Sequence, residues 1–451
     1  MLEQSLDYFL ADKQGADLSD TLIAEACQTL RTNREEYLVQ IGNETIISKL
    51  VEAASLWLSP DYELRKLALA AAPETTGFPL EVLAAGLDAC FSEWTQENFF
   101  ELLGQEFGDA TRLQSFGSLS SHSLAMVHGP QLIAHVAPGN LPVPVFQSIA
   151  FGLLLRSAQF VKCASGKSLL PRLFGHTLHY VDPGLASALE IAEWDGGNET
   201  LEKELFKEAD CVVATGSDKT VGAIRGRLPL GKRFIGYGHR VSLGYVEQLA
   251  NEVMGTQTII NRAADDVVAW NQQGCLSPHV IYVEEFGNLK PERFAEMLAE
   301  ELAARSETIP RGELSTKEAG AIANIRRFYK IRSANNVGAI LWESEDSTEW
   351  TVVQEDEKQF QNSPLNRFVF VKPIEHLDEL MHILEPYRES ISTVGIAASE
   401  AKLRESALKL GAWGVPRVCP LGKMQRPPLA WRHDGRPALG DLIRWTDLET
   451  I

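Results

Sequence analysis

The sequence predicts an α/β protein with two doubly wound, parallel-sheet domains and a helical N-terminal segment. Two observations lead to this prediction. From about residue 130, short apolar runs alternate with helical stretches, and repeated strand–loop–helix units imply right-handed crossovers between parallel strands. Before about residue 108, apolar residues instead recur every three or four positions, which is the spacing of a helix face.

The N-terminal segment is expected to be helical throughout. Residues 21–26 and 50–54 carry apolar side chains at helical spacing, and Pro60, Pro73 and Pro79 punctuate the pattern. No residue pattern there indicates chemistry. We interpret this segment as a cap or as a surface for a partner.

Two successive α/β regions follow. The first has predicted strands at 132–136, 160–163, 211–214 and 233–237 and helices at about 145–157 and 167–181. The second begins near residue 244, with predicted helices at about 259–272 and 288–304 and strands at 279–283, 352, 368–371 and 393–396. In doubly wound sheets ligands bind beside the carboxyl ends of the strands, so we expect the chemistry in these loops.

The charge of the chain is unevenly distributed. Its 42 lysine and arginine residues oppose 61 aspartate and glutamate residues, and the net charge of -19 argues against a general nucleic-acid binder because phosphate would be repelled. Residues 111–181 and 219–246 nevertheless contain no acidic residue and carry eleven lysines and arginines. Long buried strands would explain the missing acids but not the bases, so the pattern favours a place for a small anionic ligand.

Nothing in the sequence indicates secretion, a membrane span or a metal site. The first residues are acidic and lack the apolar core of a signal peptide. The densest apolar run, Ile149 to Leu155, is far shorter than the roughly 18 residues of a span. The six cysteines are widely spaced and form no metal-binding pattern, so we expect a reduced, cytoplasmic protein in which a special cysteine acts as a nucleophile.

Two loops of the first α/β region carry polar side chains. Asn140 lies on a proline-rich strand-to-helix turn, where an uncharged amide suits a developing oxyanion; a helix-capping asparagine is the alternative. Lys162, Ser165 and Lys167 follow the next strand and suit a phosphate or ribose phosphate. Surface lysines beside a turn are the alternative there.

Two further turns allow a ligand to approach the backbone. Thr215, Gly216 and Ser217 join a strand to a helix, where free amides and the helix dipole favour a pyrophosphate. Gly238, after the next strand, belongs to the same class of close-approach loop. No G-x-G-x-x-G pattern is present at this turn, so an ordinary dinucleotide fingerprint is not indicated.

The second α/β region contains the candidate nucleophile. Cys275 lies between a glycine and a Ser-Pro turn in residues 271–278, which join a helix to a strand. This position is typical of an exposed thiol, and the basic stretches could supply the positive potential that activates a thiolate. A packed cysteine without chemistry is the alternative.

In combination, these loops resemble the aldehyde dehydrogenase superfamily, and within it the LuxC-like acyl-CoA reductases of bacterial luminescence systems. The resemblance runs from about His135 to the C-terminus. It rests on five segments in the right order: HVAPGNLPVPVFQSIAFGLLLRSAQFVKCAS, VVATGSDKTVGAIR, FIGYGHRVS, WNQQGCLSPHVIYVE and WRHDGRPALGDLIRW.

The resemblance assigns a role to each loop. Cys275 falls on the superfamily's nucleophile and Asn140 on its oxyanion asparagine; Lys162 falls on the lysine that meets the adenine ribose, and Gly216 and Ser217 on the turn beside the pyrophosphate. We accordingly divide the chain into a helical segment that packs on the cofactor domain (1–108), a Rossmann-like nicotinamide domain (109–243), a catalytic domain (244–425) and a C-terminal segment (426–451).

The resemblance also bears on the cofactor. NAD-preferring relatives carry a glutamate shortly after the ribose-binding lysine, whereas this sequence has Ser165 there, inside an acid-free stretch. A carboxylate would repel a 2′-phosphate, while Ser165 with Lys162 or Lys167 could accept one. The sequence therefore predicts NADPH as the cofactor.

One departure from the superfamily decides the expected reaction. Aldehyde-oxidising members carry a general-base glutamate where this chain has Gly236. Without that base an acyl-thioester on Cys275 resists hydrolysis and survives for transfer or reduction. The family's later Glu-x-Phe-Gly-Pro loop is also degraded, to Phe360–Pro364, which places its usual ribose contact in doubt.

We therefore expect NADPH-dependent reduction of an acyl-CoA, with a fatty acyl chain, to the aldehyde. An aldehyde-oxidising dehydrogenase, and a non-reducing acyl-carrying transferase or binding subunit, remain as alternatives. A homo-oligomer is expected, and family members pair with an acyl-protein synthetase, for which the helical N-terminus is a candidate surface. His239 could assist proton transfer, but beside Arg240 it is more simply a contributor to positive potential.

Overall fold

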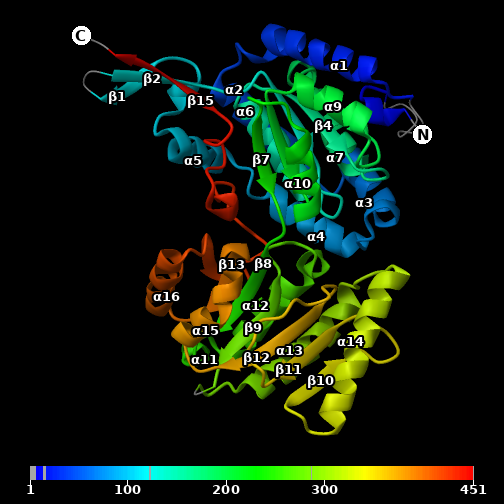
Figure 1. Ribbon diagram of the computed structural model, residues 1–451, viewed down its shortest axis with the longest axis vertical. Helices are drawn as coiled ribbons and strands as arrows, with labels where there is room; N and C mark the ends of the chain where they lie inside the picture. Colours follow the sequence, from blue (N-terminus) through cyan, green and yellow to red (C-terminus); the bar gives the residue numbers. More distant parts are fainter. Residues whose placement is uncertain (1–6, 14–16, 121–122, 286, 450–451) are drawn as a thin grey trace. The chain divides into compact units, whose positions relative to one another are not determined.

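The computed structural model describes residues 7–13, 17–120, 123–285 and 287–449. These form two compact units (Figure 1). The first unit comprises Met1–Thr76, Leu87–Gly238 and Pro428–Ile451, and the second comprises Gly77–Gly86 and His239–Pro427. Among the described residues, no helix combines the length and the apolar character that crossing a membrane requires.

A five-stranded parallel sheet forms the centre of the first unit, with the strand order β5-β4-β3-β6-β7. Its strands are β3 (Leu132–Val136), β4 (Ala158–Cys163), β5 (Leu189–Glu193), β6 (Cys211–Thr215) and β7 (Arg233–Tyr237). From β3 the chain runs to β4 and β5 on one side and then to β6 and β7 on the other. This reversal is the switch point at which doubly wound sheets bind ligands.

Helices cover both faces of this sheet (Figure 1). One face carries α1 (Asp20–Asn33), α9 (Glu199–Glu208) and α10 (Asp218–Arg227). The other carries α6 (Val143–Leu154) and α7 (Leu169–Val181), against which α2 (Asn43–Leu58) and α3 (Glu63–Thr76) pack. The first unit also contains α5 (Gln96–Phe107) and the short α8 (Pro183–Ala186), while α4 (Leu80–Phe91) begins in the second unit and ends in the first. The helical N-terminal segment is thus confirmed.

A second, antiparallel sheet was not predicted. It has the order β1-β2-β15, with β1 (Gly117–Ser120), β2 (Ser123–His128) and β15 (Arg444–Glu449). All six residues of β15 are exposed. A strand with neither face buried lacks the apolar alternation on which strand prediction depends.

The second unit is built on a seven-stranded sheet with the order β10-β11-β12-β9-β8-β13-β14. Only the β10–β11 pair is antiparallel. The strands are β8 (Val241–Val246), β9 (Pro278–Glu284), β10 (Ala339–Glu343), β11 (Thr351–Glu355), β12 (Phe368–Ile374), β13 (Ile391–Ala397) and β14 (Arg417–Pro420). These strands confirm the predicted second parallel sheet.

Apolar side chains from helices bury both faces of this sheet. One core includes α11 (Ala250–Met254), α12 (Thr256–Val268) and α13 (Pro291–Thr308). The other includes α14 (Thr316–Ala334), α15 (Leu377–Leu384) and α16 (Glu400–Trp413). Strands buried on both faces read as continuous apolar runs, which is why 279–283 and 368–371 were recognisable from sequence.

Candidate functional site

The first unit gathers most of the predicted site residues at one edge of its sheet. Asn140 follows β3, Ser165 and Lys167 follow β4, Thr215 to Ser217 end β6, and Gly238 follows β7. Because these strands are parallel, their carboxyl ends lie at the same edge. The structure therefore brings these loops together at the switch point.

Asn140 is exposed on this edge. Helix α6 begins at Val143 and its N-cap is Pro142, so Asn140 does not occupy the cap position considered as an alternative. A pocket joins its loop to the next one, because Asn140 and Lys167 both line it.

The Ser165 loop is not free of acids in space. The Ser165 hydroxyl lies 2.5 Å from the Asp195 carboxylate, and the backbone N–H of Gly166 donates to Glu193 across 2.7 Å. Both carboxylates come from the end of β5 and the loop after it. The acid-free stretch of sequence therefore has acids beside it in space, and the neighbouring strand supplies them.

The two lysines of this edge are not free surface side chains. Lys162 is buried in β4 with its ammonium 5.7 Å from the centre of the Trp194 ring, and burial lowers its pKa. Lys167 donates to the carbonyl of Thr75. A buried cation is stabilised by any anion that reaches it, so Lys162 favours a phosphate-bearing ligand at this edge.

The turn after β6 leads directly into helix α10. Ser217 caps α10, its hydroxyl accepting from the Thr220 N–H at 3.2 Å. The first-turn N–H groups and the positive end of the α10 dipole point out of this turn. Gly238 keeps the turn narrow, since a Cβ there would collide with the Asp218 carboxylate.

The position of the missing general base is closed by packing. A Cβ at Gly236 would lie 2.5 Å from Val221 and 2.9 Å from the Phe234 ring. No larger side chain fits there without rearrangement, so this part of the first unit is built for glycine.

Cys275 lies in the second unit, at the amino end of β9 rather than at a carboxyl end. Its side chain is half-buried, and its carbonyl accepts from the Ser242 hydroxyl at 2.7 Å. Ser242 stands near the start of β8, which pairs in parallel with β9. The carboxyl-end rule therefore describes the loops of the first unit but does not describe the cysteine loop.

The backbone before Cys275 is strained. The predicted helix 259–272 ends at Val268, and Trp270, Asn271 and Gln272 have left-handed φ angles of 51°, 50° and 64°. Each such residue other than glycine costs about 1 kcal/mol or more. Three in succession require strong tertiary support.

A second left-handed run provides that support. Leu365, Asn366 and Arg367 have φ angles of 64°, 58° and 63°. The Asn366 N–H donates to the Asn271 carbonyl at 3.1 Å, and the Arg367 guanidinium donates to the Asn271 side-chain oxygen at 3.1 Å. Arg367 is fully buried and also donates to the Ile309 carbonyl at 2.7 Å. The two runs therefore hold each other in place.

Sequence reasoning missed a buried cation whose charge interacts with Cys275. Arg417, buried in β14, donates to the carbonyls of Met424 at 2.7 Å and Lys423 at 2.8 Å. Its guanidinium lies close enough to Cys275 for their charges to interact. A positive charge favours a thiolate. Arg417 lies outside both basic stretches, and its signal was an arginine inside a buried strand.

His279, the second residue of β9, stays neutral. Its Nδ1 accepts from the Ser363 N–H at 3.0 Å, and burial, together with the nearby His239, lowers its pKa to about 4. His279 therefore accepts a hydrogen bond from the segment that contains Ser363 and carries no positive charge.

Solved structures define the class of fold. The bifunctional proline utilization A protein superposes with a TM-score of 0.72 at 15% identity, covering 99% of this chain and 46% of its own. This chain thus spans about half of that protein's length. The salicylaldehyde dehydrogenase of Pseudomonas putida G7 superposes with a TM-score of 0.70 at 14% identity, covering 97% of this chain and 92% of its own. The fold is that of the aldehyde dehydrogenases.

The family follows from sequence comparison. The profile of the LuxC acyl-CoA reductases matches residues 38–445, and the chain belongs to this family. The long-chain acyl-protein thioester reductase of Vibrio harveyi is 21% identical over 420 residues, covering 92% of this chain and 84% of that protein. The predicted family and fold class are both confirmed.

Proposed function

We propose that this enzyme reduces a fatty acyl-CoA to the aldehyde with NADPH, through an acyl-enzyme on Cys275. The observation that carries the proposal is the cysteine itself. Cys275 is half-buried, follows the hydrogen-bonded left-handed turn at residues 270–272, and interacts electrostatically with the buried guanidinium of Arg417. A thiol held in one place next to positive charge is the arrangement that thioester exchange requires.

The proposed reaction has two stages. The Cys275 thiolate attacks the acyl carbonyl, and the coenzyme A thiolate leaves and takes up a proton. A hydride then converts the cysteinyl thioester to a thiohemiacetal, which collapses to the aldehyde and returns the thiolate. In both stages an oxyanion develops, for which we propose the Asn140 amide and the Cys275 N–H as donors.

The lack of room for a larger side chain at Gly236 supports reduction over aldehyde oxidation. An oxidising dehydrogenase needs a base to activate water against the acyl-enzyme. Packing by Val221 and Phe234 leaves no room for a carboxylate at this position. The acyl-enzyme would then persist until hydride arrives.

The first unit fits a nicotinamide cofactor. The α10 N-terminus with Gly216 and Ser217 would hold a pyrophosphate, and Lys162 would lie under the ribose end. The bound cofactor supplies the hydride. We propose NADPH because Lys162 at the end of β4 and Lys167 in the loop after it offer two cations to a 2′-phosphate. NADH is the second candidate, since Asp195 holds Ser165 and a carboxylate suits a free ribose diol.

An assay with both cofactors distinguishes NADPH from NADH as the hydride donor. Reduction of decanoyl-CoA should proceed with a higher kcat/KM for NADPH than for NADH. A clear preference for NADH would reject the 2′-phosphate assignment and leave the reductase proposal standing.

The nucleophile is tested by replacing it. Cys275→Ser should lower kcat by about 10³-fold or more and abolish the labelled acyl-enzyme formed from radioactive acyl-CoA. Cys90→Ser is the matched control, because burial raises the pKa of Cys90 to about 12 and makes it inert. Full acyl-enzyme formation by the Cys275 variant would reject the proposal.

The same measurement addresses the non-reducing transferase. If acyl-enzyme forms but no nicotinamide absorbance is lost on adding acyl-CoA with either cofactor, the chain is an acyl carrier. The proposed acyl-protein synthetase partner and the homo-oligomer remain predictions, which co-purification and sedimentation analysis would check. A partner-bound acyl group in place of acyl-CoA would leave the chemistry at Cys275 unchanged.

A further inference from the structure

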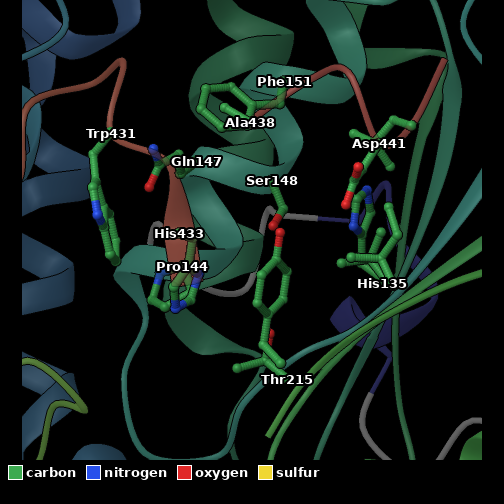
Figure 2. A pocket seen from close by; sticks show the side chains of 14 residues that line it. His135, Pro144, Gln147, Ser148, Phe151, Thr215, Trp431, His433, Ala438 and Asp441 are labelled. Atoms are coloured by element: carbon green, nitrogen blue, oxygen red, sulfur yellow. The ribbon is translucent and has the colours of Figure 1, made fainter. Parts of the chain in front are cut away.

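The segment that follows β14 contributes to both units. Trp431, His433 and Asp441 line a pocket of the first unit, as Figure 2 shows. Residues 421–425 belong instead to the second unit, and they pack against the loop that carries Cys275. This second contact is the one that bears on the proposed nucleophile.

Cys275 lies inside a tight turn that begins at Gly274 and ends at Ser277. The turn is closed by the Ser277 N–H, which donates to the Gly274 carbonyl at 3.0 Å. The half-buried side chain of Gln425 contacts both ends. Its amide N–H donates to the Ser277 hydroxyl, and a Cβ at Gly274 would lie only 2.8 Å from its amide oxygen. Gln425 therefore contacts the first and the last residue of the turn around Cys275.

The 421–425 loop is held between a buried carboxyl group and a buried guanidinium. The Asp266 carboxylate, on α12, accepts from the N–H groups of Gly422 at 2.5 Å and Met424 at 2.9 Å. The Arg417 guanidinium, on β14, donates to two carbonyls of the same loop. Asp266 is 1% exposed, so water does not compete for its oxygens. One short loop therefore has its N–H groups on a carboxylate and its carbonyls on a guanidinium.

Close packing seats the same loop against α12 and β13. A Cβ at Gly422 would lie 2.7 Å from the Cβ of Arg262, which is one helical turn before Asp266 on α12. Gly422 has a φ angle of 88°, which glycine adopts without strain. Met424 is fully buried, and a Cβ at Gly395 in β13 would lie 2.5 Å from its sulfur. The loop thus has a single seat, and Asp266 is the group that fixes its backbone there.

The Asp266 carboxylate is costly to bury. Burial raises its pKa to about 7, and Asp265 acts in the same direction, although the Gly422 and Met424 N–H groups and Arg417 oppose the rise. An uncharged side chain at this position would avoid the cost of burial. What the carboxylate provides is a defined position for the loop that contacts the Cys275 turn.

We propose that Gln425 and Asp266 are positioning residues for the Cys275 thiol: Asp266 fixes the 421–425 loop, and Gln425 fixes the turn against that loop. The proposal rests on the function proposed for Cys275. A thiolate must meet the acyl carbonyl of a bound substrate in one orientation, and a small displacement slows the attack strongly. A small reagent in free solution approaches from any open direction and does not need that orientation.

Two reactions of the same thiol separate orientation from general damage. Gln425→Ala removes the contact without changing any charge. Single-turnover acylation of Cys275 by decanoyl-CoA should fall about tenfold in this variant. Alkylation by iodoacetamide, followed at Cys275 by mass spectrometry at a pH where the thiol is fully ionised, should not fall, because the turn is less enclosed. A protein that is merely less folded would lose both rates in equal proportion.

A double-mutant cycle tests whether Asp266 acts through the loop. Asp266→Asn keeps one acceptor oxygen and loses the other, so acylation at pH 8 should again fall about tenfold. Because both residues act through one loop, the double variant should be no slower than the slower single variant. Glu190→Gln is the matched control, since Glu190 also accepts from two backbone N–H groups but lies in the first unit, and both of its rates should stay unchanged. If Asp266→Asn does not fold, Asp266→Ser, which is smaller and keeps one acceptor, replaces it in the cycle.

The pH profile of alkylation gives a readout that does not need the reductase reaction. In Gln425→Ala the midpoint of this profile should rise, because the thiol is no longer held near the Arg417 charge. An unchanged acylation rate in Gln425→Ala overturns the proposal, and so does an equal fall in acylation and alkylation. Additive losses in the double variant remove Asp266 from it. If the wild type forms no acyl-enzyme, the proposed function fails, while the shift of the alkylation midpoint still decides whether Gln425 positions the thiol.

Discussion

Two asparagines show that the two units hold their candidate site residues in different ways. Asn271, four residues before Cys275, is buried with a left-handed backbone, and both atoms of its amide are hydrogen-bonded inside the second unit. Asn140 is exposed on a loop of the first unit, outside any helix cap. The turn before Cys275, the proposed nucleophile, is held by buried hydrogen bonds, while Asn140, the proposed oxyanion residue, lies on a short proline-rich loop.

The difference shows that the second unit uses buried hydrogen bonds to hold a strained turn, whereas the first unit uses unstrained strand ends and a helix N-terminus. The cysteine loop sits at the amino ends of β8 and β9, where no strand or helix geometry presents a thiol. It needs buried side chains, among them Arg367, to hold a strained turn. The cofactor edge uses strand ends and the N-terminus of α10, which present N–H groups without strain. Its polar side chains make local hydrogen bonds, among them Ser165 to Asp195 and Ser217 to the Thr220 N–H.

The largest expected effect comes from breaking the support at Asn271. Asn271→Ala removes the hydrogen bonds from Arg367 Nε and to the Arg311 carbonyl, and it puts alanine in a left-handed conformation. Denaturant unfolding should show a loss of about 4 kcal/mol. The rate of Cys275 alkylation by iodoacetamide should change as well, because the thiol is no longer held beside Arg417.

Glycine at the same position separates strain from lost hydrogen bonds. Asn271→Gly also removes the side chain but adopts the left-handed conformation freely, so it should recover about 1 kcal/mol over Asn271→Ala. Asn336→Ala is the control, because Asn336 is left-handed but exposed just after α14. It should show the cost of alanine in a left-handed conformation without the loss of buried hydrogen bonds. Equal stabilities for the glycine and alanine variants would show that the left-handed turn carries no strain.

Much of the fold was predictable because its strands are buried. Strands 132–136 and 233–237 have the predicted bounds, and both parallel sheets are present. The sheet β1-β2-β15 escaped prediction because it begins in a Gly-Ser sequence and ends in a fully exposed strand. Local sequence predicts the strands that are buried in a core, because burial requires apolar residues, and it misses strands that are exposed.

The site was less predictable, because its surroundings come from distant segments. The left-handed turn at Trp270 depends on residues 365–367, so the helical pattern alone extended the helix too far. Asp195 reaches Ser165 from the next strand, so an acid-free stretch of sequence did not make an acid-free place. Arg417 approaches Cys275 from β14. The polar residues of each loop were predictable from the sequence, whereas the residues from distant segments that surround them in space were not.

Buried polar support exists in the first unit too, but it can be titrated. The Glu190 carboxylate in β5 accepts from the N–H groups of Leu10 and Ile191, both at 2.8 Å, and burial raises its pKa to about 7. The folded state therefore binds this proton more tightly than the unfolded state does. The resulting stability is fully present below the ordinary pKa of 4.5 and is lost as the pH rises through about 7.

Glu190→Gln keeps the accepting oxygen and removes the titration. Unfolding free energies of the two proteins should agree near pH 4, and the variant should become about 3 kcal/mol more stable than the wild type near pH 8. Denaturant titrations at both pH values measure this. A constant difference between the proteins across that range would mean that Glu190 does not titrate there. The support of the Cys275 loop at Asn271 and Arg367 instead rests on an amide and a guanidinium, neither of which titrates over this range, so its contribution should not vary.

Asn140→Ala should reverse the pattern expected at Asn271. Its side chain is exposed, so the unfolding free energy should change by less than about 0.5 kcal/mol. If Asn140 donates to the developing oxyanion, kcat should nevertheless fall about 10²-fold, equivalent to about 2.7 kcal/mol of transition-state stabilisation, with little change in KM. Single-turnover reduction of preformed acyl-enzyme isolates that step. Asn140→Asp sharpens the test, because it keeps the size of the side chain but replaces the donor with a negative charge, so it should be at least as slow. A normal rate in either variant would remove Asn140 from the reaction and leave the rigid cysteine loop as the chemical centre of the protein.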